Sequence, residues 1–401
     1  MASIGIIREG KIPADNRVAL TPAQCKWIGK HFPASKIYVQ PSSVRCYSDS
    51  EYERAGAIIT EDMAAADILL GIKEVCSDDL IPDKTYLFFS HTKKLQLHNQ
   101  SLFRAMIQKR ITLIDYECLE HEDGQRMIGF GFFAGVVGAH NGIMAYGNRT
   151  GLFSLNRVYK YKDFRSLIHS YFELKLPPIR IVVTGSGRVA HGIMEVLNLM
   201  GVREVEPDEY RTRQFTYPVY TQLKGAALYR NKNKGTYTRE EFHADPTHFE
   251  CLFSDYLFCT DILLNGIYWE KDMPRLFESS QIQQTQFNIV TIADVTDDAF
   301  GSVPINLGDQ TLEDPVYGVD RNTLRKTVPY QPNSIDVMAV GNLPNELPRD
   351  ASRYFGEQLI KFLLEDLLLK KENPALTHAM LLQQGQLTPA YQYMRSYAGL
   401  H

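Results

Sequence analysis

The sequence predicts an α/β fold with two domains, each organised around a parallel β-sheet. The chain has 401 residues, more than one hydrophobic core usually holds, so two domains are expected. From Ile4 to about residue 130, short apolar runs alternate with amphipathic stretches, as strands and helices do in a parallel α/β domain. A second alternation begins after Pro177 and Pro178 with a strand, a glycine-rich turn and a helix.

In the first domain the spacing of apolar residues places each element. We expect strands within 3–9, 36–42, 66–74, 84–92 and 111–117. Helical spacing predicts helices within 21–32, 49–57 and 97–110. The stretch 129–147 is rich in glycine and alanine. Glycine costs about 1 kcal/mol per site in a helix interior, so we expect a helix there that packs closely on a neighbour.

The second domain is predicted in the same way. An amphipathic stretch at 163–178 precedes it, and 179–210 has the pattern of a strand, a turn, a helix and a second strand. Further strands are expected within 256–264 and 287–295. The polar segment 216–249 is too long for a simple loop, so we expect structure within it. The helical run at 350–371 is expected to return to the first domain.

Composition limits the class of protein. Hydrophobic residues make up 44% and charged residues 22%, as in ordinary globular proteins, and the net charge of −4 argues against a duplex nucleic-acid partner. The N-terminus lacks the apolar core of a signal peptide, and no run is long enough to span a membrane, so we expect a cytoplasmic protein that acts on small molecules. The six cysteines show no zinc-site spacing, so we expect reduced packing residues and no metal.

The segment 181–190, IVVTGSGRVA, matches the pattern GxGxxA directly after an expected strand and at the start of an expected helix. Gly185 permits the tight turn, and Gly187 lets the backbone approach a pyrophosphate. The helix beginning near Arg188 directs unpaired N–H groups and its positive dipole end at that anion. We therefore expect a nicotinamide dinucleotide at Gly185, Ser186, Gly187, Arg188, Val189 and Ala190. The alternative is a turn that only packs a helix on a sheet.

The phosphorylation state of the cofactor is left open by the residues that follow the turn. Glu206 and Asp208 lie about 20 positions further on, where an acidic residue accepts a hydrogen bond from the ribose of NAD. Arg211 and Arg213 come just beyond, and an arginine there suits the 2′-phosphate of NADP. We therefore expect NADP(H) or NAD(H).

Lys73 and His91 directly follow two expected strands of the first domain. The carboxyl ends of parallel strands are where open α/β sheets bind ligands, and a Lys beside a His can relay protons near neutral pH. A solvated Lys and a structural His are the alternatives.

Three further residues are candidates for substrate binding. Arg17, before the helix start at Thr21, is suited to a substrate carboxylate. Glu117 and Arg126 are similar candidates, with an ion pair between domains as the alternative.

Several blocks resemble a known superfamily, that of the alanine dehydrogenases, saccharopine dehydrogenases and transhydrogenases. The blocks NRVALTPA, GIKE, FFSHTKK and GSGRVA occur in that order. Within the superfamily, the segments SHTKK, LIDYE, GQRMIGFGFFAGVVG, VEP, LLNGIYWEKDMPRL and NLPNELPRDAS are similar to the lysine-ketoglutarate reductase domains of aminoadipic semialdehyde synthases. The likeness spans nearly the whole chain.

The resemblance implies two Rossmann-like domains with the active-site cleft between them. Residues 1–130 with 342–401 would form the substrate-binding catalytic domain, and 131–341 the dinucleotide-binding domain. It implies Lys73 and His91 as the acid/base pair, Arg17 and Lys94 near substrate carboxylates, and Asp298 near the nicotinamide.

One departure from the family concerns Gly341. The family members usually have an Asp next to the cofactor before the NLP or HLP motif, whereas this chain has Val340, Gly341 and Asn342. The expected reaction is NAD(P)H-dependent reductive condensation of L-lysine with 2-oxoglutarate to saccharopine. The alternatives are an alanine dehydrogenase-like or opine-type amino-acid dehydrogenase, and a non-catalytic dinucleotide-binding regulatory protein. A homo-oligomer is compatible with each.

Overall fold

The computed structural model describes residues 1–400, and the chain divides into two compact units. The first unit comprises Met1–Phe130 and the chain from Pro348 onward, and the second is Gly131–Leu347. Residues 342–347, which the sequence analysis assigns to the first domain, lie in the second unit. There Glu346 Oε1 accepts a hydrogen bond of 2.8 Å from Asn141 Nδ2, within the same unit.

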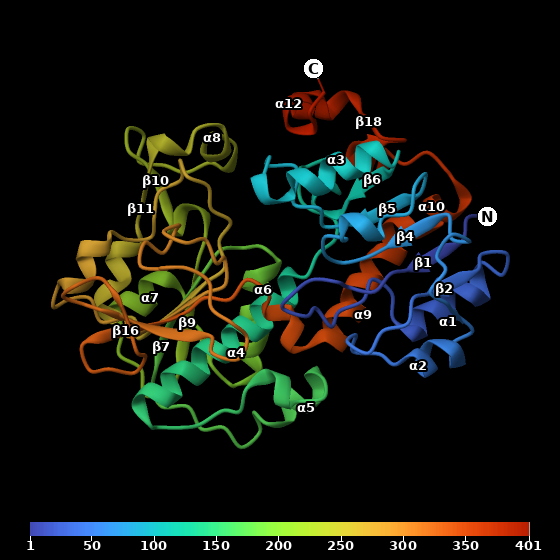
Figure 1. The fold of residues 1–401 in the computed structure, drawn as a ribbon. Helices are drawn as coiled ribbons and strands as arrows, with labels where there is room; N and C mark the ends of the chain where they lie inside the picture. Colours follow the sequence, from blue (N-terminus) through green and yellow to red (C-terminus); the bar gives the residue numbers. More distant parts are fainter. Residues whose placement is uncertain (401) are drawn as a thin grey trace. The chain divides into compact units, whose positions relative to one another are not determined.

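The first unit is built on an eight-stranded sheet with the order β18-β17-β6-β5-β4-β1-β2-β3 (Figure 1). Strands β1 to β6 run parallel to one another. At one edge β17 pairs antiparallel with β6, and β18 pairs antiparallel with β17. Their bounds are β1 (Ile4–Ile6), β2 (Ile37–Val39), β3 (Ile58–Ile59), β4 (Ile68–Leu70), β5 (Thr85–Phe88), β6 (Thr112–Asp115), β17 (Met380–Gln383) and β18 (Gln386–Leu387).

Helices from both ends of the chain accompany this sheet. They are α1 (Pro22–His31), α2 (Asp49–Arg54), α3 (Gln100–Gln108), α9 (Pro348–Leu359), α10 (Glu365–Leu369), α11 (Pro374–Ala379) and α12 (Arg395–Ala398). Ser352 of α9 accepts a bond of 2.9 Å from the backbone N–H of Val18, which fixes this helix beside the N-terminal segment. The single helix expected at 350–371 is interrupted by a π-helical turn at Ile360–Leu364.

The second unit contains another eight-stranded sheet, ordered β15-β14-β16-β13-β12-β7-β9-β8, and a separate hairpin of β10 and β11. Strands β7, β8, β9, β12, β13 and β16 run parallel, and β14 and β15 are antiparallel. The strands are β7 (Arg180–Thr184), β8 (Arg203–Glu204), β9 (Val219–Leu223), β10 (Tyr229–Asn231), β11 (Phe249–Cys251), β12 (Ile262–Asn265), β13 (Thr291–Asp294), β14 (Val316–Asp320), β15 (Lys326–Thr327) and β16 (Ser334–Met338).

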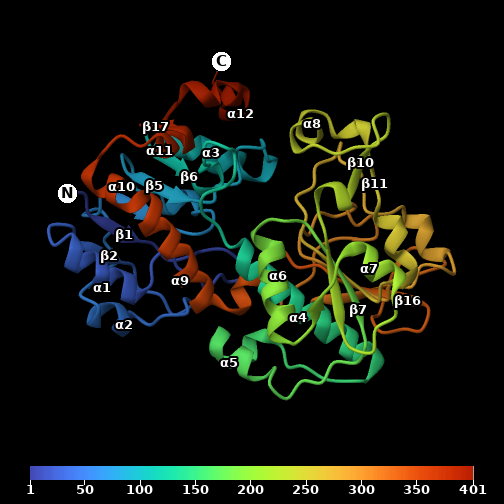
Figure 2. The ribbon, with the colours of Figure 1, turned by 180° about the vertical axis from the view of Figure 1, so that it is seen from behind.

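The helices of the second unit are α4 (Gly131–Thr150), α5 (Phe164–His169), α6 (Arg188–Leu199), α7 (Pro207–Thr212) and α8 (Arg239–Ala244). The close packing expected of the glycine-rich helix is confirmed, since α4 and α6 lie side by side (Figures 1 and 2). A Cβ added at Gly135 would lie 2.0 Å from Val189 O, and one at Gly192 would lie 2.0 Å from Phe132 O. Only glycine allows these two backbones to approach so closely.

Two expectations for the second unit meet different outcomes. The segment 216–249 does contain its own structure, namely β9, β10 and α8. The strand expected across 256–264 is wrong in its first half, because Phe253–Cys259 forms 3₁₀ turns. The hydroxyl of Thr260 donates to Tyr256 O at 2.8 Å and favours a helical turn there.

No helix in residues 1–400 is long and apolar enough to cross a membrane. In the same range, no group of three or more His, Cys, Asp or Glu side chains is arranged to hold a metal ion. All six cysteines are free, but Cys76 is exposed, so the expectation that each packs in a core is wrong for this residue.

Candidate active site

Chemically active side chains gather at the carboxyl edge of the first unit's sheet. Glu9, Lys73 and His91 each follow a strand by three residues, and the strands concerned, β1, β4 and β5, are consecutive parallel neighbours. Because parallel strands end at the same edge, this spacing brings the three side chains to one region. The placement of Lys73 and His91 at strand ends is as the sequence predicted.

His91 is held by a carboxylate. Its Nδ1 lies 2.6 Å from Glu74 Oε1, and Glu74 Oε2 accepts from Lys11 Nζ at 2.9 Å. Burial alone raises the pKa of Glu74, but the contacts with His91 and Lys11 outweigh it and hold this pKa well below its usual range. His91 also has a φ of 49°, an uncommon backbone conformation for a residue other than glycine. The imidazole is thus fixed through Nδ1, with Nε2 as its second functional atom.

Lys73 has an amine that gives up its proton more readily than an ordinary lysine. Burial lowers its pKa, and the positive charge of Arg17 lowers it further. In residues 1–400, its Nζ makes no hydrogen bond or ion pair with another side chain. The arrangement therefore provides a base and an imidazole on one sheet edge.

Arg17 forms a buried ion pair with Asp15. Its Nε and Nη2 donate to the two carboxylate oxygens at 2.9 and 2.5 Å, and its guanidinium lies 4.2 Å from the centre of the Phe130 ring. Both charged residues are at most 3% exposed. Although burial raises the pKa of Asp15, Arg17 outweighs this effect and lowers the pKa to about 2. The guanidinium is therefore held in a fixed orientation.

Two buried carboxyl groups support this edge. Glu9 accepts hydrogen bonds from the backbone N–H groups of Ile72 and Lys73 at 2.6 and 2.8 Å, and burial raises its pKa to about 7. Asp115, at the end of β6, accepts from the backbone N–H of Ser90 at 3.2 Å, and burial raises its pKa to about 6. These bonds connect the segment after β1 to the segment after β4, and the end of β6 to the segment after β5.

The other substrate candidates lie more openly. Lys94 is exposed, and within residues 1–400 its amine has no hydrogen-bonding partner. Arg126 is exposed and donates to Glu117 Oε1 at 3.0 Å, an ion pair within the first unit. The alternative of an ion pair between domains is therefore wrong for these two residues.

The glycine-rich turn of the second unit has the geometry that a pyrophosphate requires. Gly185 has a φ of 99°, and a Cβ there would lie 2.6 Å from Gly266 O. Both the backbone conformation and the lack of space therefore exclude a side chain at this position. Gly187 is the N-cap of α6 in extended conformation, and no side chain caps the helix. Ser186 and Gly187 are exposed, and Arg188, Val189 and Ala190 form the first turn of α6. The residues present fit a bound dinucleotide.

Glu206 follows a strand that is not a neighbour of the strand that carries this turn. Strand β8, which ends at Glu204, does not pair with β7, because β9 lies between them. Glu206 is exposed at the start of α7. Arg211 pairs with Asp208 at 2.6 Å, and Arg213 pairs with Glu209 at 2.8 Å. Each arginine thus forms an exposed ion pair with an acidic residue of α7.

Carboxylates occupy the space beside Gly341. Its N–H donates to Asp309 Oδ1 at 2.8 Å, and a Cβ added there would lie 3.1 Å from Asp297 Oδ2. Burial and the nearby charges of Asp309 and Asp294 raise the pKa of Asp297. Asp298 is exposed in the loop after β13. An acidic residue at position 341 would therefore face two other carboxyl groups.

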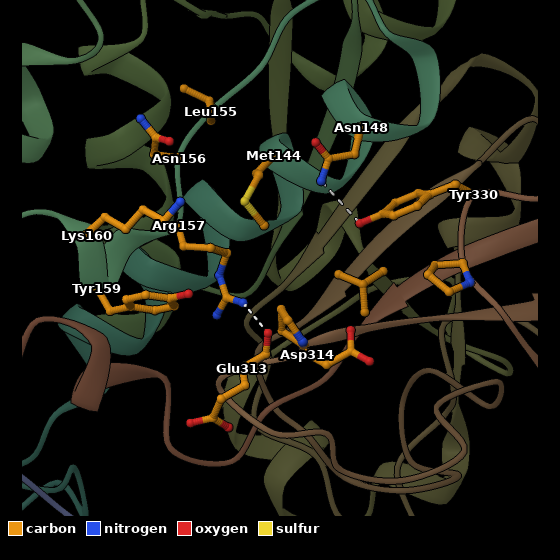
Figure 3. A pocket seen from close by; sticks show the side chains of 13 residues that line it. Met144, Asn148, Leu155, Asn156, Arg157, Tyr159, Lys160, Glu313, Asp314 and Tyr330 are labelled. Atoms are coloured by element: carbon orange, nitrogen blue, oxygen red, sulfur yellow. Dashed lines mark hydrogen bonds between the residues drawn. The ribbon is translucent and has the colours of Figure 1, made fainter.

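A cavity of about 300 Å³ lies elsewhere in the second unit (Figure 3). Met144 and Asn148 of α4 line it, with Arg157 opposite, whose Nη1 donates to Glu313 O at 3.0 Å. It contains none of the residues that the sequence indicated for a site, and we assign it no part in the chemistry.

Comparison with known proteins identifies the first part of the chain. Residues 5–137 match the model for the alanine dehydrogenase/PNT N-terminal domain. This part of the chain belongs to that domain family. The alanine dehydrogenase/PNT N-terminal domain thus includes Arg17, Lys73 and His91.

The chain is homologous to larger and to similarly sized enzymes. It is 31% identical to mitochondrial alpha-aminoadipic semialdehyde synthase of Rattus norvegicus, over 95% of this chain and 46% of that protein. The alpha-aminoadipic semialdehyde synthase of Arabidopsis thaliana is 28% identical, over 98% of this chain and 41% of that protein. The chain therefore spans about half the length of these relatives. A saccharopine dehydrogenase (NAD(+), L-lysine-forming) of Candida glabrata is 26% identical, over 88% of each chain. Because one relative is mitochondrial by name, the cytoplasmic location stays a prediction.

Solved structures confirm the predicted fold class. An L-alanine dehydrogenase superposes with a TM-score of 0.66 at 16% identity, covering 98% of this chain and 99% of that one. A transhydrogenase from Sinorhizobium meliloti superposes with a TM-score of 0.59 at 14% identity, covering 96% of this chain and 99% of that one. The chain thus has the Rossmann-like folds, with largely parallel sheets, of these proteins.

Sequence reasoning missed four carboxyl groups of the alanine dehydrogenase/PNT N-terminal domain: Glu9, Asp15, Glu74 and Asp115. The strand-end rule that selected Lys73 and His91 also selects Glu9 when it is applied to the first strand. Glu74 follows Lys73 in the same block, GIKE. The partnership of Asp15 with Arg17 had no signal beyond their closeness in sequence.

Proposed function

We propose that this protein is an NAD(P)-dependent oxidoreductase that condenses L-lysine with 2-oxoglutarate and reduces the product to saccharopine. The observation that carries the proposal is the cluster of Lys73, His91 and Glu74 at the carboxyl edge of the first sheet. The relatives support it, since their names include saccharopine dehydrogenase and aminoadipic semialdehyde synthase.

The reaction joins the side-chain amine of lysine to the carbonyl carbon of the oxo acid, with loss of water and formation of an imine. Lys73 accepts a proton from the attacking ammonium group, since its lowered pKa increases the fraction of the amine that is neutral and can act as a base. The departing oxygen leaves as water, with one proton from His91 Nε2 and the second from the attacking nitrogen, while Glu74 keeps the imidazole oriented through Nδ1.

The substrates carry carboxylates that need cationic partners. Arg17, oriented by Asp15, is assigned to one of them, and the exposed Lys94 to another. The bound dinucleotide supplies the hydride that reduces the imine carbon. The Gly185 turn and the uncapped start of α6 are assigned to its pyrophosphate.

The test is steady-state oxidation of NADPH and of NADH in the presence of L-lysine and 2-oxoglutarate. We expect turnover that requires both substrates and falls when either is omitted. A panel of other amino acids and oxo acids is the control. Turnover with another pair and none with lysine plus 2-oxoglutarate would falsify the lysine assignment.

Gly341 favours a second candidate, an alanine dehydrogenase-like or opine-type amino-acid dehydrogenase. At this position the chain lacks the Asp that the resemblance leads one to expect. The same panel separates the two, because this candidate predicts activity with an amino acid and oxo acid other than lysine and 2-oxoglutarate. Dinucleotide binding without turnover of any pair favours the third candidate, a regulatory protein on the same fold.

A further inference from the structure

The strand order of the second unit changes which residue lies next to a bound ribose. In a dinucleotide-binding sheet, the adenosine ribose lies at the carboxyl end of the strand adjacent to the strand that carries the glycine-rich turn. Strand β7 has two parallel neighbours, β12 and β9. On the β12 side the sheet continues to β13 and β16, as it does beyond the first strand toward the fourth, fifth and sixth in the strand order 3-2-1-4-5-6, so the ribose side is that of β9. Strand β9 pairs with β7 from Arg180 opposite Val219 to Thr184 opposite Leu223. The residue that follows this end is Lys224.

Hydrogen bonds fix the end of β9 against the turn. The N–H of Gly185 donates to Leu223 O at 3.0 Å, and Gln222 Nε2 donates to Gly185 O at 2.8 Å. Lys224 therefore follows directly on a residue that is bonded to the first glycine of the motif. Its backbone is extended, and Gly225 then turns with a φ of 51°.

The charge of Lys224 has not been neutralised by a partner. The residue is exposed, and among residues 1–400 its amine contacts no carboxylate or other acceptor. Neighbouring lysines of the same segment differ, since Lys232 donates to Thr247 O at 2.9 Å and Lys234 pairs with Glu241 at 2.5 Å. Lys224 thus presents an ammonium group at the sheet edge of the glycine-rich turn.

The acidic alternative lies farther away. Neighbouring strands are about 5 Å apart, so the end of β8, near Glu206, is about 10 Å from β7. Arg211 is held by Asp208 at 2.6 Å and by Asp255 at 3.5 Å. Neither Glu206 nor Arg211 is therefore as well placed as Lys224 to meet a group on the ribose.

We propose that Lys224 binds the 2′-phosphate of the cofactor and that the protein prefers NADPH to NADH. The inference rests on the proposed function only in that the Gly185 turn holds a dinucleotide. The inference adds to the proposed function a binding residue outside the glycine motif, Lys224, and a preference for the 2′-phosphorylated cofactor.

The test is equilibrium binding of NADPH, NADH, 2′,5′-ADP and 5′-ADP to the full chain, which needs no turnover. We expect NADPH to bind roughly 10- to 100-fold more tightly than NADH, as a charge-assisted contact to phosphate gives. Lys224→Ala loses most of this factor and leaves the Kd of NADH within about twofold. Lys224→Arg retains the preference for NADPH. In each variant the affinity for 2′,5′-ADP changes in the same direction as the affinity for NADPH.

Lys175→Ala is the matched control, an exposed lysine in the segment before β7, away from the carboxyl edge, and it leaves all four affinities unchanged. An equal affinity of the wild-type protein for NADPH and NADH overturns this inference but leaves the proposed function standing. So does a change of preference in Glu206→Ala but not in Lys224→Ala. Failure of every nucleotide to bind overturns the dinucleotide site itself, and with it the proposed function.

Discussion

The carboxyl edges of the two sheets differ in composition: the first is lined by charged side chains and the second by glycines. In the first unit the edge consists of charged side chains tied to one another, such as Glu74 with His91 and Asp15 with Arg17. In the second unit the edge begins with Gly185 and Gly187 and with a helix that no side chain caps. The proposed function assigns proton transfer to the first edge, whereas the second edge leaves backbone N–H groups open to an anion. Substitutions should therefore affect turnover at the first edge and binding at the second.

The largest effect is expected for Lys73→Met, which removes the proposed base. We expect kcat to fall about 100- to 10,000-fold, the contribution of a positioned acid or base, with the Kd of the dinucleotide unchanged. Lys30→Met, at an exposed position of α1, is the control. A variant with at least a tenth of the wild-type rate would remove Lys73 from the mechanism.

The second edge is tested by Gly187→Ala. Gly187 is extended, and a Cβ there meets nothing within 4 Å, so the fold tolerates the change. The methyl group instead obstructs the approach of a pyrophosphate, and we expect dinucleotide affinity to fall about 10- to 100-fold with an unchanged Tm. Gly29→Ala, at another open glycine, should leave affinity intact. Undiminished binding by Gly187→Ala would place the dinucleotide elsewhere.

A smaller effect is expected for Glu74→Gln, because it acts through His91. The amide can still contact Nδ1, but it carries no negative charge beside the imidazole. We expect kcat to fall about 10-fold, with a changed pH profile and an unchanged dinucleotide Kd. Glu61→Gln, which removes an exposed ion pair with Arg8 at 2.8 Å, is the control. An unaltered pH profile would show that Glu74 has only a structural role.

The two edges also differ in how far the sequence predicts them. Lys73 and His91 could be predicted because each follows a local apolar run, and the glycine turn because its motif is contiguous. The position of Lys224 could not be predicted, since it depends on β9 entering the sheet between β7 and β8. The carboxylates beside Gly341 come from Asp297 and Asp309, which only tertiary packing brings there. Non-local pairing therefore limits the prediction.

The smallest effect concerns Glu9 and the pH dependence of stability. Its pKa is about 7 in the folded protein against an ordinary value of 4.5, so the folded state binds more protons between these values. The free energy of unfolding should therefore fall as pH rises from about 4.5 to 7, by at most about 1.4 kcal/mol per pH unit for one proton.

Urea unfolding of the wild-type protein and of Glu9→Gln at several pH values measures this contribution. Other buried carboxyl groups affect both proteins alike, so the difference between the two curves isolates Glu9. We expect the variant to show the flatter dependence on pH. Parallel curves would mean that Glu9 is ionised in the folded protein across this range.

The most direct test of the proposed chemistry is product analysis. The protein is incubated with L-lysine, 2-oxoglutarate and NADPH, and mass spectrometry quantifies the condensation product alongside nucleotide oxidation. We predict that one saccharopine forms per NADPH oxidised. With Lys73→Met, we expect both saccharopine formation and NADPH oxidation to fall about 100- to 10,000-fold. NADPH oxidation without saccharopine, or saccharopine formed undiminished by Lys73→Met, would contradict the account.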